Sequence, residues 1–483
     1  MDQIMQMDYA AASAANPLHS RHRSRWTFLL DSYMGGDEYR KGGYLTRYAL
    51  ENDAEYSQRC AVTLLTNHCR SIIATYISFM FRMPPERELG SLESDLTIAD
   101  FLEDCDWEGI NLDAFMKTAA IYANVFGHTW IMMSKPDVGA ITRADELAAG
   151  ARPYLNMMSP LTVTDWKWDR KPNGSYELTY FKYVEDSDGD VSVIKEWTKE
   201  LITTITVNHK DQVVNSKQID INGLGAIPAV IMYAARSPVR GLGLSSIDDI
   251  ADTQRMIYNL HSEAEQAIRL GSHPSLVATE RTQIGSGAGA LIRMEESMDP
   301  NLKPYVLDFT GSDVTSIQAT IAALEGTIDK MANTGAIRAT EAKTMSGVSR
   351  EAEFQLLNSR LSEMADNIQL AEEQLWQWYA QYQGQTWDGE INYPDSFAIR
   401  DTDNELDQLI KAKTAIEYGP ARSAIDNEII ELLDLNLDEQ PGNPDNNSYD
   451  QQLQEEVSES QEEINEEQAE RDAVAIASTL TAK

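Results

Sequence analysis

The sequence predicts an α+β protein in which helices dominate the first and last thirds and a block of short strands lies between them. Apolar residues recur at every third or fourth position through most of the chain, as in amphipathic helices, but the period changes to two between His128 and Met232. Turn-rich pieces such as "DRKPNGS" and "EDSDGD" separate the apolar runs of that block. We therefore expect an antiparallel sheet of hairpins embedded in a helical protein.

The N-terminal third is predicted to be mostly helical. "RSRWTFLLDSYMGG" has the spacing of a short amphipathic helix, which Gly35 and Gly36 would end. A single helix is expected from about Tyr56 until Pro84 and Pro85 break it. Two further helical segments are expected in "TIADFLEDCD" and "NLDAFMKTAAIYANVFG".

Six β-branched and aromatic runs are predicted to be the strands of the central block. They are "HTWIMMSK", "LTVTDWKWD", "SYELTYFKYV", "VSVIKEWTK", "LITTITVNH" and "AVIMYAA".

Two long helices are predicted after the strands. The first begins at Ser245 and Ser246, each followed three residues later by Asp, as in a capping box, and it continues to about Leu270. Its apolar side is marked by Ile247, Ile250, Ile257 and Ile268. The second begins at Ser312, and its apolar residues alternate steps of three and four, as in a packing seam: Val314, Ile317, Ile321, Leu324, Ile328 and Met331. Because the residues between the two helices are irregular and rich in Gly and Pro, we expect an antiparallel helix pair with a small module at its tip.

A flexible, basic loop and a very long helix follow. The loop, residues 334–349, is rich in Gly, Ser and Thr, and Arg338, Lys343 and Arg350 stand in it or at its edge. The helix runs to about Gln383, with an apolar stripe formed by Phe354, Leu357, Leu361, Met364, Ile368, Ala371, Leu375, Trp378 and Tyr382. A strand-like piece, "EINYPDSFAIRD", a helix pair broken at Gly419 and Pro420, and an acidic tail from Asp438 complete the chain. The tail has too few large apolar residues to bury a core.

Composition limits the partners that such a chain can have. It has 40 Lys and Arg against 77 Asp and Glu, a formal net charge of −37. Most of its surface should repel nucleic acid and anionic membranes, so any contact with DNA must be local. Cys60, Cys69 and Cys105 lack zinc-type spacing and predict reduced thiols in a cytosolic setting. Because we find neither a leader nor an apolar run long enough to cross a bilayer, we expect no secretion signal and no membrane span.

A search for chemistry-bearing motifs finds none. There is no G-x-x-x-x-G-K-[ST], no H-E-x-x-H and no G-x-S-x-G. "GSGAGA", at residues 285–290, lacks the lysine of a phosphate-binding loop, and a turn or close-packing role is favoured. "DSDGD" resembles the start of a calcium loop, but Val191 and Trp197 stand where an EF-hand needs Gly and Glu. We therefore expect no enzymatic activity, no metal and no cofactor.

Four short stretches, taken in order, carry a family resemblance. "YISFMFRMPPERE", "GLGLSSIDDIADTQRMIYNLHSEAEQA", "SGVSREAEFQLLNSRL" and "AIEYGPARSAIDNEIIELL" are similar to segments of the portal proteins of tailed bacteriophages. In that family they correspond to the end of an N-terminal helix, the opening of the first stem helix, the segment after the tunnel loop, and the helices leading to the crown. The resemblance covers nearly the whole chain.

The resemblance implies a division of the chain into the parts of a portal subunit. A wing of helices and β-hairpins would span residues 1–240, followed by a first stem helix at 241–271 and a clip at 272–311. A second stem helix would follow at 312–333 and a tunnel loop at 334–349. A long wing helix and strand would occupy 350–401, crown helices 402–437 and an acidic tail 438–483.

The resemblance also implies a function. Portals of this family are rings, usually of twelve subunits, at one vertex of the capsid, and double-stranded DNA is packaged and ejected through them without sequence specificity. The implied partners are the major capsid protein, the terminase and later a head-tail adaptor or neck protein, with no membrane involved. The protein would reside in the virion, after assembly in the host bacterial cytoplasm.

Two sets of residues follow as candidates for this function. The tunnel loop would bring Arg338, Lys343 and Arg350 to the DNA channel, although ordinary solvated charge explains any one of them, and Arg350 could instead pair with Glu351 or Glu353. Packing of the stem and of the oligomer is expected of the isoleucine and leucine series: Ile247, Ile250, Ile257, Ile317, Ile321, Leu324 and Ile328.

Two alternatives come from other classes of protein. The acidic tail and the apolar seams also suit a coiled-coil scaffold or assembly chaperone without a DNA channel, although the strand-rich block is more elaborate than such a protein needs. A hydrolase with an unrecognised site is the third interpretation, and the motif search disfavours it.

Overall fold

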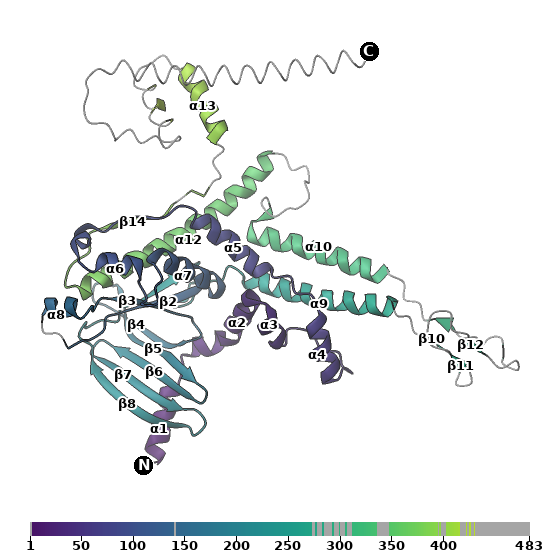
Figure 1. Cartoon of the computed structure of the whole chain (residues 1–483), viewed down its shortest axis with the longest axis horizontal. Helices are drawn as coiled ribbons and strands as arrows, with labels where there is room; N and C mark the ends of the chain where they lie inside the picture. The colour runs from purple at the N-terminus through teal and green to yellow at the C-terminus, as the bar shows by residue number, and fades with distance from the viewer. Residues whose placement is uncertain are drawn as a thin grey trace. The chain divides into compact units, whose positions relative to one another are not determined.

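The computed structural model is a mixed helix and sheet protein with antiparallel sheets (Figure 1). It describes residues 2–139, 142–272, 276–277, 283–284, 292–293, 299, 305–306, 312–335, 347–394, 396–397, 402–415, 422, 425–426 and 429. The chain divides into two units, Met1–Ala398 and Ile399–Lys483. The first unit contains all the strands and the long helices, and the second contains α13 (Thr402–Ala415). The predicted second crown helix falls mostly outside the described residues, and the acidic tail falls outside them entirely.

The strand block forms two antiparallel sheets, and the prediction of one sheet is wrong. A three-stranded sheet has the order β3-β2-β9, and a five-stranded sheet has the order β4-β5-β6-β7-β8. The strands are β2 (His128–Ser134), β3 (Tyr154–Met158), β4 (Val163–Arg170), β5 (Tyr176–Asp188), β6 (Val191–Thr198), β7 (Leu201–Asn208), β8 (Val213–Ile221) and β9 (Ala229–Tyr233). The two predicted turns join β4 to β5 and β5 to β6. The sheets meet through Trp130, whose ring lies 4.8 Å from Phe181 and 5.8 Å from Trp168 between centroids.

The sequence pattern missed β3 and β8 for different reasons. The sequence of β3, "YLNMM", has no β-branched residue and breaks the alternation with an asparagine. The strand β8 lies at the edge of its sheet, and its residues 215–221 are all exposed, so no apolar alternation marks it.

Helices make up most of residues 2–126, and one more lies between β2 and β3. They are α1 (Asp2–Ser13), α2 (Pro17–Met34), α3 (Gly36–Lys41), α4 (Asp53–Val62), α5 (His68–Met80), η1 (Gly90–Ser94), α6 (Ile98–Glu103), α7 (Leu112–Phe126) and α8 (Arg143–Ala148). The prediction of one helix from Tyr56 to Pro84 is wrong, because the chain breaks between α4 and α5. Thr63 adopts an extended conformation, and the Asn67 side chain caps α5 by accepting from the Arg70 N–H at 2.8 Å. Asn67 also donates to the Tyr33 carbonyl at 2.9 Å, so a tertiary contact fixes the break.

The helix α12 (Gly347–Tyr382) crosses the first unit and packs on β9, β2 and α5. Its predicted apolar stripe is confirmed, since Leu357, Leu361, Met364, Ile368 and Leu375 are all buried. After it, β14 (Glu390–Asn392) pairs with β1 (Glu86–Glu88), which joins segments about three hundred residues apart.

A buried charge secures this region. Glu372 of α12 is 1% exposed and accepts from Arg87 Nε at 2.5 Å, from Tyr393 Oη at 2.6 Å and from Trp376 Nε1 at 3.2 Å. Each of these partners compensates part of the cost of removing the carboxylate from water.

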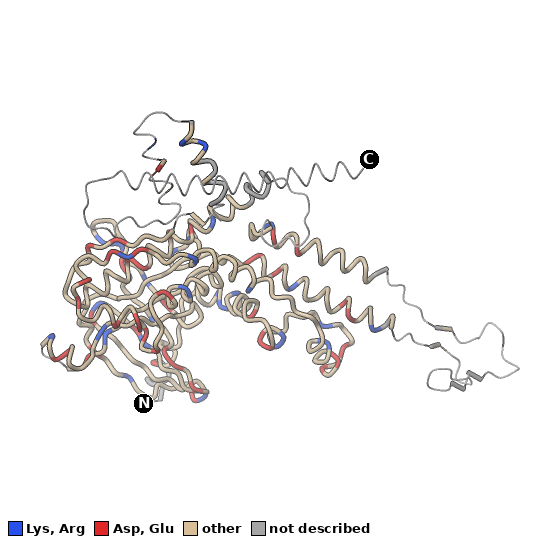
Figure 2. Tube along the Cα trace, turned by 45° about the horizontal axis from the view of Figure 1, so that its top comes forward, with Lys and Arg blue, Asp and Glu red and all other residues tan. Residues whose placement is uncertain are grey.

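The helices α9 (Asp248–Ser272) and α10 (Ser312–Ala332) lie side by side in both ribbon views (Figures 1 and 2). Beyond them β10 (Leu276–Val277) pairs antiparallel with β13 (Tyr305–Val306), and β11 (Gln283–Ile284) pairs with β12 (Ile292–Arg293). The predicted antiparallel helix pair is therefore present, with short strands between its two helices in the sequence.

The strand β2 begins at a histidine that is fully buried. Burial lowers the pKa of His128 to about 3, and the charge of His22 adds to the effect. The His128 ring packs edge-on against Trp26, and its Nδ1 accepts from the Gly243 N–H at 3.3 Å. None of the described residues forms a hydrogen bond with its Nε2. Just before it, Gly127 has φ +91°, and a Cβ there would meet the Gly243 carbonyl oxygen at 2.5 Å, so this close approach requires glycine.

We predict that His128 makes the fold acid-sensitive. Unfolded chains bind the proton near pH 6.5 while the folded chain resists it down to about pH 3, so stability is complete above pH 6.5 and falls with pH between these values. His128→Phe should reduce this slope by up to about 1.4 kcal/mol per pH unit, measured by urea unfolding at a series of pH values. The exposed His209→Gln is the control. Equal slopes in wild type and His128→Phe would show that His128 does not carry the effect.

Candidate functional site: the helix pair and its attachment to the long helix

The predicted packing residues of the helix pair lie inside a single chain. Ile247, Ile250 and Ile257 are at most 2% exposed, and Ile321 and Ile328 are buried as well. Ile317 and Leu324 are half-buried and pack on the same core. These side chains join the pair to the body of the first unit. Their predicted part in contacts between subunits stays a prediction. Ile268 departs from the predicted apolar side, because it is 49% exposed.

The base of α9 is held by the end of α7, and the predicted capping box is wrong. Ser246 Oγ donates to Asn124 Oδ1 at 2.6 Å, and Ser245 Oγ donates to the Val125 carbonyl at 2.7 Å. The two hydroxyls therefore satisfy the last turn of another helix, and α9 itself begins only at Asp248.

An arginine of α2 binds the first turns of α9. Arg25 Nε donates to Asp248 Oδ1 and Arg25 Nη2 to Asp252 Oδ2, both at 2.8 Å. Burial opposes the charge of Arg25, but its hydrogen bonds to Asp252 and Asp248 outweigh burial and raise its pKa. Negative charge in the first turn also suits the helix dipole, so this ion pair fixes the direction in which α9 leaves the body.

The middle of α9 is held by a buried arginine of α4. Arg59 is 4% exposed, and it donates to Glu51 Oε2 at 2.7 Å, to the Thr46 carbonyl at 2.7 Å and to Ser262 Oγ of α9 at 3.0 Å. The hydrogen bonds from Arg59 lower the pKa of Glu51. Gln254, also on α9, donates to the Ser32 carbonyl and accepts from the Cys69 N–H. The polar face of α9 is thus bound to the N-terminal helices from Asp248 to Ser262, over about four turns.

Both helices of the pair meet α12 at one arginine. Arg360 donates to the Met331 carbonyl at 3.3 Å, at the end of α10, and to the Ser246 carbonyl at 3.4 Å, just before α9. Its guanidinium lies 5.0 Å from the ring centroid of Tyr76, whose hydroxyl donates to the Ala332 carbonyl at 2.6 Å. The C-terminal carbonyls of α10, which have no partner within the helix, are therefore bound by α5 and α12.

Of the three predicted channel residues, the structure describes only the backbone of Arg350. Arg338 and Lys343 lie outside the described residues. Arg350 lies in the first turn of α12, and its side chain is not described. The structure does describe the two ends of the predicted loop. Thr334, just after α10, is buried, and α12 begins at Gly347.

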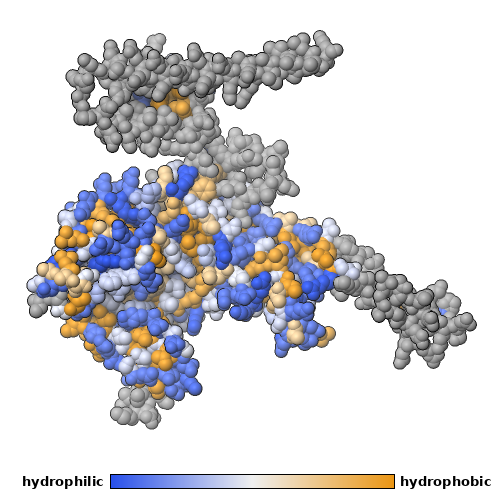
Figure 3. Space-filling model, in the orientation of Figure 1, coloured by the Kyte–Doolittle hydropathy of each residue, from blue (hydrophilic) through white to orange (hydrophobic). Residues whose placement is uncertain are grey.

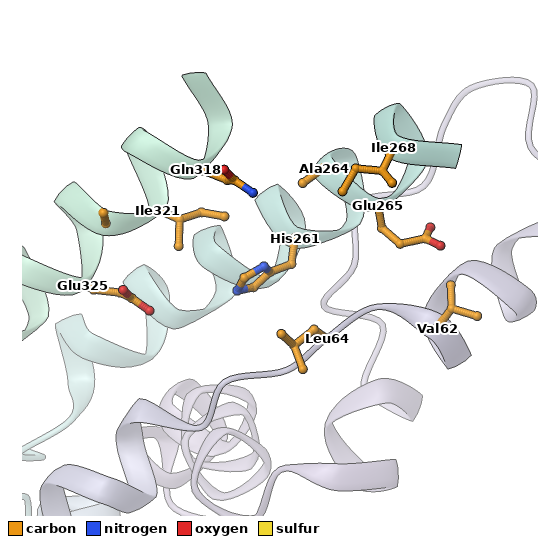
Figure 4. A pocket seen from close by; sticks show the side chains of 10 residues that line it. Val62, Leu64, His261, Ala264, Glu265, Ile268, Gln318, Ile321 and Glu325 are labelled. Atoms are coloured by element: carbon orange, nitrogen blue, oxygen red, sulfur yellow. The ribbon is translucent and has the colours of Figure 1, made fainter. Parts of the chain in front are cut away.

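A shallow cavity of about 320 Å³ lies where the helix pair meets the α4–α5 connection (Figure 4). Leu64 and Ile268, 59% and 49% exposed, give it an apolar rim, and Gln318 and Glu325 line it from α10. The space-filling view also shows hydrophobic surface on the helix pair (Figure 3). His261 lines the cavity, and burial lowers its pKa against the opposing charge of Glu325. Exposed apolar surface of this kind is typical of protein contacts.

Within the described residues, no group of three or more His, Cys, Asp and Glu side chains is placed to hold a metal ion. No helix in that part of the chain is both long and apolar enough to cross a membrane.

Comparisons with known proteins give only distant structural likenesses. No protein-family model matches the chain, and a search of curated proteins finds no match. A solved structure of the neck of an empty gene transfer agent (GTA) particle has 11% identity and a TM-score of 0.43, covering 81% of this chain and 99% of that one. A chain from the virion of a native GTA particle has 12% identity and a TM-score of 0.40, covering 74% of this chain and 89% of that one.

We predict that Leu324→Asp loosens the helix pair. Leu324 packs in the seam against the core, so a carboxylate there loses apolar contacts and is partly desolvated without a partner, at a cost of roughly 1–3 kcal/mol. Urea unfolding and amide hydrogen exchange of α10 would measure the loss. Ala323→Asp, at the adjacent exposed position, is the matched control. If the two variants are equally stable, the seam does not hold the pair.

Proposed function

We propose that this protein is a portal protein, which forms a ring at one vertex of a phage-like capsid and passes double-stranded DNA through its centre. The observation that carries the proposal is the antiparallel pair α9–α10, bound at one end to the body and joined at Arg360 to a helix of 36 residues. This arrangement places two stiff elements and the segment between α10 and α12 at one junction.

A ring of subunits would explain the arrangement of the helices at the Arg360 junction. Subunits joined head to tail around an axis present the same segment repeatedly toward the centre. A Gly/Ser/Thr-rich segment can follow a moving duplex, while α12, one face of which is buried from Leu357 to Ala380, fixes the segment to the body. Each subunit adds a formal charge of −37, and a wall of this sign disfavours lasting contacts with phosphates. Arg338, Lys343 and Arg350 would then supply brief contacts to the backbone of any DNA sequence.

The proposal includes the partners that such a ring requires. They are the major capsid protein around it, a terminase during packaging and a head-tail adaptor or neck protein afterwards. We propose no enzymatic activity for the chain itself, since the terminase would supply the energy. The site of action would be the virion, with assembly in the host bacterial cytoplasm.

A second candidate function is an acidic scaffold or assembly chaperone without a channel. The exposed apolar rim formed by Leu64 and Ile268 favours it as much as it favours a ring, because either protein needs a contact surface.

The mass of the purified protein tests the proposal. Native mass spectrometry should give one closed oligomer, of twelve subunits or a neighbouring number, and negative-stain images should show a ring with a central hole. A monodisperse monomer at micromolar concentration would contradict the proposal. Small rods or globules without a hole would favour the scaffold.

We predict that Arg338 and Lys343 act in packaging and not in assembly. Replacing both with Glu should leave rings and empty capsids normal but lower the amount of full-length DNA that is packaged or retained. The defect should depend on salt, because phosphate contacts are screened. Replacing Lys210 and Lys217 of the exposed β7–β8 region with Glu gives the same change of charge as a control. Normal genome content in the Arg338/Lys343 variant would remove these residues from the mechanism.

A further inference from the structure

Three arginines gather where β9 leads to α9, beside the turn between β4 and β5. The guanidinium of Arg240 lies 3.5 Å from the ring centroid of Tyr176, and that of Arg170 lies 5.9 Å from the same centroid. Arg236 lies 5.2 Å from the ring centroid of Tyr233. All three arginines are exposed, and Tyr176 is 49% exposed. We call this group the arginine cluster.

Within the part of the chain that the structure describes, no Asp or Glu side chain forms an ion pair with any of these three arginines. Arg170 Nε donates to the Gly174 carbonyl, and Arg236 Nε donates to the amide oxygen of Asn367, which are both neutral acceptors. Arg240 makes the ring contact with Tyr176. Two guanidinium groups on one tyrosine ring repel each other, and an anion that binds both would relieve this repulsion.

The neighbouring lysines behave differently: Lys167 lies on β4, Lys171 in the turn after it and Lys199 just after β6. Lys167 pairs with Asp169 at 3.4 Å, and Lys171 pairs with Glu177 at 3.3 Å. Lys199 also contacts Glu177. In a chain with almost twice as many acidic as basic residues, unpaired arginines are therefore a local exception rather than a consequence of composition.

The backbone holds Arg240 in place. Gly241 follows it with φ +82°, and a Cβ there would meet the Trp166 indole nitrogen at 2.4 Å. The turn is closed by the Leu242 N–H, which donates to the Val239 carbonyl at 3.1 Å. Ser237 Oγ accepts from the Val239 N–H at 3.1 Å. A fixed turn and a stacked guanidinium reduce the entropy lost when a partner binds.

We propose that the arginine cluster binds an acidic surface of a second copy of this chain. The inference rests on the proposed function, since it names a contact that closes the ring. Every copy carries a large excess of carboxylates, and Arg binds them through two parallel hydrogen bonds. Tyr and Arg are also enriched at the centres of protein interfaces. The exposed Val239, next to Arg240 in the sequence, offers apolar surface for the same contact. DNA is the less favoured occupant, because a phosphate backbone would match the arginines but not the exposed apolar Val239 beside them.

The test compares two double variants with the same change in net charge. Arg170→Glu/Arg240→Glu reverses the cluster, and Lys210→Glu/Lys217→Glu reverses two exposed lysines on β8 and the turn before it. Assembly of each purified protein is followed by mass photometry over a range of concentrations. We expect the arginine variant to need roughly tenfold or more protein for half assembly, with wild type and the lysine variant equal. The single variant Arg240→Lys keeps the charge but loses the planar guanidinium. Its concentration for half assembly should lie between those of wild type and the arginine variant.

Each other outcome overturns the inference. If wild type and both double variants assemble alike, the cluster is not an intersubunit contact, while the proposed ring survives. If wild type stays monomeric, both the ring and this contact are wrong. If assembly is equal but only the arginine variant loses salt-dependent binding of a duplex DNA, the occupant is a phosphate backbone. Unchanged thermal unfolding of the monomeric fraction shows that the arginine variant is folded.

Discussion

The burial of α12 is the constraint on which the rest of the first unit depends. This helix contacts the three-stranded sheet, α5 and β14, and its residues from Leu357 to Ala380 contribute much of the apolar core. Glu372 extends the same helix into the β1–β14 pairing through Arg87 and Tyr393. Removing the packing of α12 would take apolar contacts from the sheet and leave the end of α10 without Arg360, while α7 would still join the sheet to α5.

Elements with strong internal periodicity could be predicted from the sequence. The seam of α10 and the stripe of α12 each follow a helical period over many turns, and the burial of Ile321, Ile328 and Leu361 agrees with it. The β4–β5 and β5–β6 hairpins could be predicted as well, because turn residues separate runs in which apolar and polar residues alternate. In these elements, one face is in water and the other is in the core. The order of polar and apolar residues therefore indicates the structure by itself.

Features that depend on distant partners could not be predicted. The break between α4 and α5 requires the Tyr33 carbonyl, and the serines before α9 serve α7 instead of their own helix. Arg59 and Arg360 are ordinary charged residues in the sequence. Arg360 directly precedes Leu361 of the apolar stripe, and a charge beside a buried position is a local sign of its role. The arginine cluster joins a hairpin turn to a loop more than sixty residues away, which no local pattern encodes.

The helix pair is attached unequally, and this has a mechanical consequence. The side-chain bonds to α9 are spread from Asp248 to Ser262, whereas Tyr76 and Arg360 hold α10 at its last turn. A load applied at the far end of the pair would therefore be carried along α9 as along a clamped beam. The helix α10, packed along its seam and held at Ala332, would carry the same load as a strut to its last turn. Displacement at the tip would reach α12 as a push or pull on the Arg360 junction, the point from which the chain continues toward Arg338 and Lys343.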